Sequence, residues 1–263
     1  MSKIVFFDID GTLLDDDKNL PSSTKAAVKA LQKNGIYTAI ATGRGPFMVT
    51  QVINELDIDS YVAFNGQFVV FEKEVIYKNP FNPTELKRFA SEANKRNHPL
   101  VYMSEKTLKG NVEKDKRIAD SMASLQLVHP DVDPDYYVKE DIYQTLLYAK
   151  EDEEEYLSAF EDIYTFIRWH KEAMDVVPKG GSKAEGIKIL IERLGFKMED
   201  VYAFGDGLND IEMLKTVGTG VAMGNAHEAV KIHADIVTER VENNGIAVGL
   251  KKVGLLDDSF EII

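Results

Sequence analysis

Short apolar runs alternate with amphipathic segments over the first third of the chain. Apolar runs that end at polar loops are typical of buried parallel strands, and apolar residues repeating roughly every three to four positions indicate helices. The predicted strands are residues 3–7, 37–41 and 61–64. The predicted helices between them are residues 22–33, capped by Ser22 or Ser23, and 46–56. A hairpin of residues 67–71 and 75–78 is expected to follow. This order favours an open α/β sheet.

The pattern changes at Asn79-Pro80-Phe81-Asn82-Pro83 and changes back at Pro178-Lys179-Gly180-Gly181. Clusters of Pro and Gly mark turns between elements. Between the clusters we expect helices at 84–97, 114–127 and 151–162, and strands at 100–103, 142–149, 164–169 and 173–177. Beyond them the alternation returns, with a helix at 183–194, a strand at 201–204 and a helix at 210–215. The sequence therefore predicts a discontinuous core domain, residues 1–81 and 179–263, interrupted by an inserted domain, residues 82–178.

Length and composition narrow the class of protein. The chain has 263 residues, enough for one to two domains, and 44% of them are hydrophobic. No apolar run approaches the roughly 18 residues of a membrane span. Asp8 interrupts the apolar run near the start, so we expect no signal peptide and a cytoplasmic location. The chain has no cysteine, which excludes disulfides, thiolate metal sites and a cysteine nucleophile.

The net charge indicates which partners are compatible. With 31 Lys and Arg against 44 Asp and Glu, the formal charge is −13. A surface of this sign repels nucleic-acid phosphates. The basic residues between Lys106 and Arg117 alternate with acidic ones, so they do not form a basic stripe. We therefore expect no nucleic acid and no membrane as partner, whereas a small anion can still bind through local amides, a lysine and a metal ion.

Two carboxylates follow the first predicted strand. Asp8 and Asp10 lie two residues apart, and Gly11 allows the backbone to turn sharply behind them. Ligands of open α/β sheets bind at the carboxyl ends of the strands. An ordinary acidic turn is the alternative, because Asp-Gly is common in turns. The position after a buried strand favours a functional site.

A second acidic loop, Gly205-Asp206-Gly207-Leu208-Asn209-Asp210, follows the predicted strand 201–204. Asp210 has an alternative role as a helix cap. If both acidic loops meet, each like-charged pair at about 4 Å costs about 4 kcal/mol at an effective dielectric constant near 20. A cation must offset this repulsion. Carboxylate ligands without Cys or His favour a hard ion such as Mg²⁺.

Two further segments suit an anion. Thr42 follows the second predicted strand and offers a hydroxyl and an amide, and Gly43 permits close approach. Lys183 opens a helix after Gly180-Gly181-Ser182. Taken singly, the first segment is equally compatible with an ordinary loop, and the lysine with a solvated surface charge.

In their order along the chain, these motifs resemble those of the haloacid dehalogenase-like (HAD) phosphatase superfamily. The matching residues are Asp8-Ile9-Asp10-Gly11-Thr12, Thr42, Lys183 and Gly205-Asp206-Gly207-Leu208-Asn209-Asp210. The large insertion, Ala41-Thr42-Gly43-Arg44, Asn65-Gly66 and Gly181-Ser182-Lys183 are similar to the Cof-type subfamily (IIB). Gln67 departs from the small residue usual after Asn-Gly, which affects the expected substrate rim and leaves the catalytic set intact.

The resemblance implies an α/β fold with a Rossmann-like doubly wound parallel-sheet core and an inserted α+β cap that selects the substrate. It also implies a Mg²⁺-dependent phosphatase of small phosphorylated metabolites, with sugar phosphates the commonest class. We expect a monomer or a weak homodimer.

The resemblance also implies roles for individual residues. Asp8 would be the nucleophile that forms an aspartyl-phosphate, and Asp10 the general acid and then base. Asp8, the main-chain carbonyl of Asp10, and Asp206 would hold Mg²⁺. The residues expected to bind the phosphoryl oxygens are Ile9, Thr42, Gly43, Lys183 and Asn209. Asp210 would orient Lys183 or a metal-bound water.

Two other functions are alternatives to the phosphatase. A phosphohexomutase uses the same core but must hold a bisphosphate with cations of the insertion, and Arg168 is the only arginine between Arg117 and Arg193. Alternation along strand 164–171 places Arg168 and His170 on one face, either to contact substrate or as a solvated face. A phospho-accepting regulatory module needs no second acid two residues after the acceptor and no large insertion. The sequence favours the phosphatase.

Overall fold

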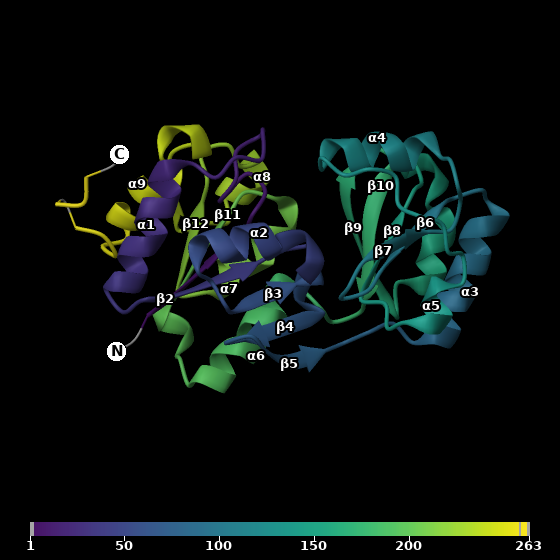
Figure 1. The fold of residues 1–263 in the computed structure, drawn as a ribbon, viewed down its shortest axis with the longest axis horizontal. Coiled ribbons are helices and arrows are strands. Elements are labelled where there is room, and N and C mark those ends of the chain that lie inside the picture. Colours follow the sequence, from purple (N-terminus) through teal and green to yellow (C-terminus); the bar gives the residue numbers. More distant parts are fainter. Residues whose placement is uncertain (1–2, 258, 262–263) are drawn as a thin grey trace. The chain divides into compact units, whose positions relative to one another are not determined.

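The computed structural model describes residues 3–257 and 259–261, which form two compact units (Figure 1). The first unit contains the chain up to Arg44, Met48–Tyr77 and the chain from Ser182 onward. The second contains Gly45–Phe47 and Lys78–Gly181. The division lies a few residues outside the predicted insertion 82–178 on either side. The grouping of Gly45–Phe47 with the second unit has no counterpart in the sequence prediction.

An eight-stranded sheet forms the centre of the first unit, in the order β13-β12-β11-β1-β2-β3-β4-β5. The strands are β1 (Ile4–Phe7), β2 (Tyr37–Ala41), β3 (Tyr61–Ala63), β4 (Phe68–Phe71), β5 (Glu74–Lys78), β11 (Val201–Gly205), β12 (Thr219–Ala222) and β13 (Ile236–Val237). The pairs from β13 through β3 are parallel, and β4 pairs antiparallel with β3. β1 is central and therefore buried on both faces, which explains its uninterrupted apolar sequence.

Helices cover both faces of this sheet. They are α1 (Ser22–Lys33), α2 (Pro46–Leu56), α6 (Lys183–Leu194), α7 (Ile211–Thr216), α8 (Glu228–Lys231) and α9 (Gly245–Lys252). Val5 and Phe7 of β1 pack in one apolar cluster with α1, α2 and α9, while Ile4 and Phe6 pack in another with α6, α7 and α8. Alternate residues of β1 thus belong to two apolar clusters, one on each face of the sheet. The predicted doubly wound fold of this domain is confirmed.

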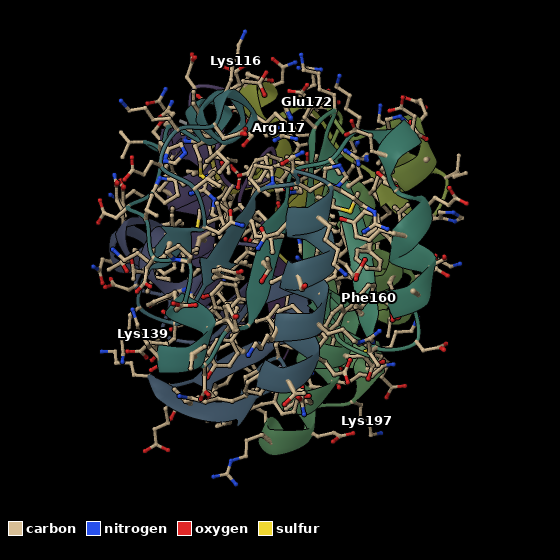
Figure 2. The ribbon with its side chains drawn as sticks, turned by 90° about the vertical axis from the view of Figure 1, so that its right-hand side faces the viewer. Lys116, Arg117, Lys139, Phe160, Glu172 and Lys197 are labelled. Carbon is tan, nitrogen blue, oxygen red and sulfur yellow. The ribbon has the colours of Figure 1, made fainter. Side chains whose placement is uncertain are left out.

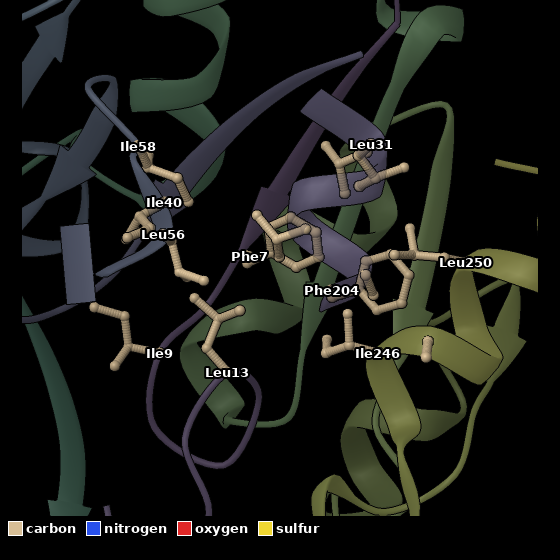
Figure 3. Close-up of a cluster of buried hydrophobic side chains, with 14 of the residues drawn as sticks. Phe7, Ile9, Leu13, Leu31, Ile40, Leu56, Ile58, Phe204, Ile246 and Leu250 are labelled. Carbon is tan, nitrogen blue, oxygen red and sulfur yellow. The ribbon is translucent and has the colours of Figure 1, made fainter. Parts of the chain in front are cut away.

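Two aromatic side chains lie in the apolar cluster next to the carboxyl ends of β1 and β11. Figure 3 shows Phe7 and Phe204 together with Leu31 of α1 and Leu250 of α9. The two rings lie 5.4 Å apart between centroids and are fully buried. Full burial of a phenylalanine side chain contributes about 1.5–3 kcal/mol. The residues that follow these two strands are therefore held on a rigid base.

The second unit is built on a five-stranded antiparallel sheet, in the order β7-β6-β8-β10-β9. The strands are β6 (Leu100–Met103), β7 (Leu108–Gly110), β8 (Gln144–Leu147), β9 (Tyr164–His170) and β10 (Ala173–Pro178). The helices are α3 (Pro83–Lys95), α4 (Lys116–Ser124) and α5 (Tyr136–Lys139). Phe89 of α3 packs edge-on against Phe160, which is labelled in Figure 2. This unit has its own apolar core, and the predicted α+β character is confirmed.

Two local predictions were wrong, and two short elements were not predicted. The acidic segment predicted as a helix at 151–162 forms two 3-10 helices, Glu151–Glu153 and Glu155–Phe160. Like charges four residues apart, as at Glu151 and Glu155, disfavour an α-helix here. Neither Ser22 nor Ser23 caps α1, since Pro21 occupies the N-cap with a φ of −60° and no side-chain hydrogen bond. β7 and α5 were not predicted because each is short and forms through tertiary contacts.

No helix in residues 3–257 and 259–261 combines the length and apolar character that crossing a lipid bilayer requires.

Candidate active site

The acidic loops meet because the strands that carry them are neighbours. β1 pairs in parallel with β11 and β2, with Phe7 opposite Phe204 on one side and Ile40 on the other. The chain continues from these strands into Asp8, Asp206 and Thr42 at one edge of the sheet. The Asp8 N–H donates to the Phe204 carbonyl at 2.9 Å, which fixes the start of the first loop against β11.

Lys183 lies between two buried carboxylates. Its Nζ donates to Asp8 Oδ1 and to Asp210 Oδ1, each at 2.6 Å, and the residue is only 1% exposed. It is the first residue of α6, whose N-cap Ser182 accepts a hydrogen bond from the Glu185 N–H. Burial alone lowers the pKa of the lysine, but the charges of Asp210 and Asp8 outweigh burial and raise that pKa. Lys183 is therefore a fixed cation beside Asp8.

Asp210 holds the second acidic loop in shape. Its Oδ2 accepts the backbone N–H groups of Asp206 and Gly207, each at 2.9 Å. A Cβ on Gly205 would lie 2.6 Å from the Asp210 carboxyl carbon, so glycine is required there. Asp210 is fully buried, and both of its oxygens are engaged. The predicted contact with Lys183 is present.

The pKa of Asp206 is raised by its surroundings in the acidic cluster. Its Oδ1 accepts a hydrogen bond from the Thr12 hydroxyl at 2.8 Å. Burial, followed by the charge of Asp210, raises the pKa of Asp206 to about 7. Burial also raises the pKa of Asp8 well above its ordinary value, although Lys183 opposes that shift. Oxygens of Asp8, Asp206 and Asp210 lie within 4.8 Å of one another, an arrangement that a divalent cation would stabilise.

Asp10 lies at the same edge but has other partners. The Arg44 guanidinium donates two hydrogen bonds to Asp10, from Nε to Oδ2 and from Nη2 to Oδ1, each 2.6 Å long. Lys18 Nζ adds a third hydrogen bond to Oδ1 at 2.7 Å. Burial favours a higher pKa for Asp10, but the hydrogen bonds and charges of the two cations outweigh burial and hold the pKa below its ordinary value. In this arrangement Asp10 is a carboxylate and a proton acceptor.

The residues predicted to bind an anion surround these acids. Thr42 is 1% exposed, and its Oγ1 accepts the Arg44 N–H at 3.1 Å. Asn209 Nδ2 donates to Asn65 Oδ1 at 3.0 Å. The Ile9 side chain is buried, and its carbonyl accepts the N–H groups of Leu13 and Leu14, which closes the loop around Asp10. The predicted site residues thus lie in the loops that follow β1, β2 and β11 and at the start of α6.

Comparison with known proteins decides the family. Residues 5–250 match the family model of the haloacid dehalogenase-like hydrolases. The chain belongs to this family.

Relatives agree along nearly the whole chain. YkrA of Bacillus subtilis strain 168, whose name classes it among phosphatases without giving a substrate, is 48% identical over 255 residues, 97% of this chain and 99% of that protein. A crystal structure of a protein from Geobacillus kaustophilus HTA426 has a TM-score of 0.91 at 54% identity and covers 97% of this chain and 100% of that one. The HAD subclass IIB sugar phosphatase BT4131 has a TM-score of 0.87 at 32% identity and covers 97% and 100%.

These findings make the chain a HAD phosphatase acting on a phosphorylated small molecule. HAD phosphatases typically use a divalent metal ion, and the aspartate cluster is able to hold one.

Sequence reasoning missed three residues of this HAD site. Arg44 and Asn65 each belong to a segment that resembles the Cof-type subfamily but received no role, and Lys18 was not considered as a site residue. Arg44 and Lys18 hold Asp10, and Asn65 holds Asn209. Arg44 had a signal, because it lies two residues beyond Thr42. Lys18 had none, since its contact depends on the path of the loop after Leu14.

Proposed function

We propose that this HAD phosphatase depends on Mg²⁺ and hydrolyses small phosphomonoesters, sugar phosphates above all, through an aspartyl-phosphate on Asp8. The observation that carries the proposal is the buried Asp8–Lys183–Asp210 arrangement, with both Nζ–Oδ1 distances at 2.6 Å. It orients one carboxylate and holds an ammonium beside it, where the charge of a phosphoryl group would collect. The name of BT4131 supports sugar phosphates as the substrate class.

The first chemical step transfers the phosphoryl group to the protein. A carboxylate oxygen of Asp8 attacks phosphorus, the bond from phosphorus to the leaving oxygen breaks, and Asp10 donates a proton to that oxygen. An Asp10 held by Arg44 and Lys18 is ionised, so it must take up a proton and release at least one of these cations before it can donate.

The second step releases phosphate. Asp10, now ionised, removes a proton from water as the water oxygen attacks phosphorus, and the bond from phosphorus to Asp8 breaks. The arrangement seen in the structure suits this step, because Asp10 is already a carboxylate. Arg44 and Lys18 then stabilise the form of Asp10 that acts as the base.

Asp8, the Asp10 carbonyl and Asp206 would hold the metal ion, whose chemistry when bound is to neutralise phosphoryl and carboxylate charge. Asp8 and Asp206 fit this role because each makes its side-chain hydrogen bond through Oδ1. Burial and the charges of nearby aspartates also disfavour their ionised forms, which a cation would offset. Asp210 fits it less well, since Lys183 and two amides occupy its oxygens.

The remaining predicted residues would bind the phosphoryl oxygens. Lys183 supplies a charge, Thr42 a hydroxyl, Asn209 an amide, and Ile9 and Gly43 their backbone N–H groups. A Cβ on Gly43 would lie 3.0 Å from Asn65 Nδ2, so the loop passes close to that side chain. Donors fixed before substrate arrives stabilise developing charge without reorganising.

The second unit would act as the cap that selects the substrate. The chain passes between the units only near Arg44, Phe47, Tyr77 and Gly181 among the described residues, and the last two of these crossings lie close to the Pro and Gly clusters of the sequence. Such segments are suited to hinge motion. A cap that opens after the leaving group departs would admit water for the second step.

Metal dependence is the first test. The activity of the protein with p-nitrophenyl phosphate is expected to fall to background after EDTA treatment and to return with added Mg²⁺, because the clustered carboxylates repel one another without a cation. Ca²⁺, which tolerates larger and less regular coordination, is the matched control and should restore little activity. Full activity in metal-free buffer contradicts the proposal.

The mutase alternative is weakened by the contacts of Arg168. Its guanidinium donates to the carbonyls of His170 at 2.8 Å and Ala149 at 3.0 Å and pairs with the Glu154 carboxylate. It is therefore committed to contacts within the second unit. Residues 81–178 carry 13 Lys and Arg against 20 Asp and Glu, which disfavours retention of a bisphosphate.

Incubation with glucose 1-phosphate and a trace of the bisphosphate separates the two reactions. A phosphatase is expected to release inorganic phosphate without accumulating the 6-phosphate isomer. Both products are followed in one time course, by a phosphate assay and a coupled assay for the isomer. Isomer that forms faster than free phosphate favours the mutase.

A further inference from the structure

The loop after β3 holds an unusual backbone. Phe64 and Asn65 both have a φ of 51°, and Gly66 follows with a φ of 96°. Left-handed conformations are unfavourable for residues with a Cβ, above all for a bulky one such as phenylalanine. They persist where surrounding contacts over-determine them, and they cluster at functional sites.

The contacts that hold this loop come from two parts of the active site. The Phe64 N–H donates to the Arg44 carbonyl at 3.1 Å, and the Asn65 N–H donates to the Thr42 carbonyl at 3.0 Å. On the other side, a Cβ on Gly66 would lie 2.0 Å from the Ser182 carbonyl oxygen. The loop therefore packs between the segment after β2 and the start of α6, where Lys183 lies.

The Asn65 side chain adds a third connection. Its Oδ1 accepts a hydrogen bond from Asn209 Nδ2 at 3.0 Å, across 144 positions of sequence. Both polar atoms of its amide lie within 3.2 Å of the place where a Cβ on Gly43 would be. Asn65 is 1% exposed, so this amide is fixed among its neighbours. One buried side chain thus contacts two of the groups expected to bind phosphate.

We propose that Asn65 is a positioning residue that fixes the Asn209 amide for phosphoryl binding; this inference rests on the phosphatase function proposed above. An amide nitrogen carries two N–H groups, and one of those on Asn209 is committed to Asn65. The direction of the other is then set as well. Without Asn65, the Asn209 side chain on its half-buried loop is free to rotate, and part of its contribution to the transition state is lost.

The test begins with Asn65→Gly, which removes the amide but tolerates the left-handed backbone. We expect kcat/KM for a phosphomonoester to fall about tenfold, as for loss of one hydrogen bond of about 1.4 kcal/mol. We also expect inorganic phosphate to become a weaker competitive inhibitor. Asn244→Gly is the matched control, because Asn244 has a φ of 62° in the same unit and makes no side-chain cap hydrogen bond.

A double variant distinguishes positioning from a general structural role. If Asn65 acts through Asn209, then adding Asn65→Gly to Asn209→Ala should change kcat/KM by less than about twofold. A structural role would instead multiply the two losses and lower the melting temperature. Losses that multiply, or wild-type kcat/KM in Asn65→Gly, overturn the inference.

Asn65→Asp keeps the proposal testable if the glycine variant does not fold. Aspartate tolerates the left-handed region and retains an acceptor for Asn209. Adding Asn209→Ala to Asn65→Asp should therefore cost as much as it costs in the wild type, and a smaller cost overturns the inference. Failure of the phosphatase function is a separate result, since the wild-type protein would then release no phosphate from any phosphomonoester.

Discussion

Asp8→Asn is expected to abolish turnover, lowering kcat by at least roughly 10⁴-fold, as for the loss of a nucleophile in other enzymes that act through covalent intermediates. An asparagine amide can still accept the hydrogen bond from Lys183, so the site should keep its shape while losing the atom that attacks phosphorus. The measurement is phosphate release together with the mass of the acid-quenched protein during turnover. The variant should show no phosphoenzyme.

Asp10→Asn is the matched control, since it changes the neighbouring carboxylate of the same loop and leaves the nucleophile in place. With p-nitrophenyl phosphate it should still form the phosphoenzyme, because a phenolate leaves with little help from an acid. With alkyl phosphates, Asp10→Asn should lose far more of the wild-type rate than it loses with p-nitrophenyl phosphate. A phosphoenzyme trapped in Asp8→Asn would assign the nucleophile to another residue, and equal losses of Asp10→Asn for both ester classes would contradict the acid role.

Parts of the fold that depend on burial were predictable from the sequence. The segments that form β1 and β11 were predicted as strands because central parallel strands are apolar on both faces. β7 was missed because Leu108–Gly110 has too few residues to show a period, and its pairing with β6 supplies the order. Residues 151–162 form 3-10 helices in place of the predicted α-helix, in which Glu151 and Glu155 would lie four residues apart with like charge.

The site, like the fold, was predictable only in part. Asp8, Thr42 and Asp206 could be expected to meet, because each follows a strand and the strands are parallel neighbours. Lys18 as a partner of Asp10 could not be expected, because the loop that carries it takes its path only in the folded structure. Arg44, the other partner, was signalled only by its place two residues beyond Thr42. The sequence names the residues at strand ends. It does not identify the loop side chains, such as Lys18 and Arg44, that orient those residues.

Lys183 illustrates how strongly burial changes the value of a charge. Taken alone in the sequence it resembles any surface lysine, yet it is 1% exposed and bridges Asp8 and Asp210. Removing one partner from a buried ion pair leaves the other charge uncompensated, which typically costs about 3–5 kcal/mol. Surface pairs are worth about 0–1 kcal/mol.

Lys183→Met is therefore expected to lose phosphatase activity and to lower the free energy of unfolding by about 3–5 kcal/mol at neutral pH. Lys188→Met is the matched control: it lies on the same helix, with its side chain 40% exposed in a pair with Glu185, and should change stability by less than about 1 kcal/mol. Urea unfolding of both variants and the wild type measures the difference. Equal effects at the two positions would show that the buried bridge does not stabilise the fold.

The pH dependence of that difference tests its electrostatic origin. Lys183 opposes the burial that raises the pKa of Asp8, so its removal should raise that pKa further. A carboxyl group whose pKa is higher in the folded than in the unfolded state destabilises the fold at high pH. This penalty begins to shrink as the pH falls through the folded pKa and is gone below the unfolded pKa. Lys183→Met should therefore lie closer to wild-type stability at about pH 5 than at about pH 8. A deficit that is the same at both values would indicate lost packing of the lysine chain, because the packing contribution does not depend on protonation.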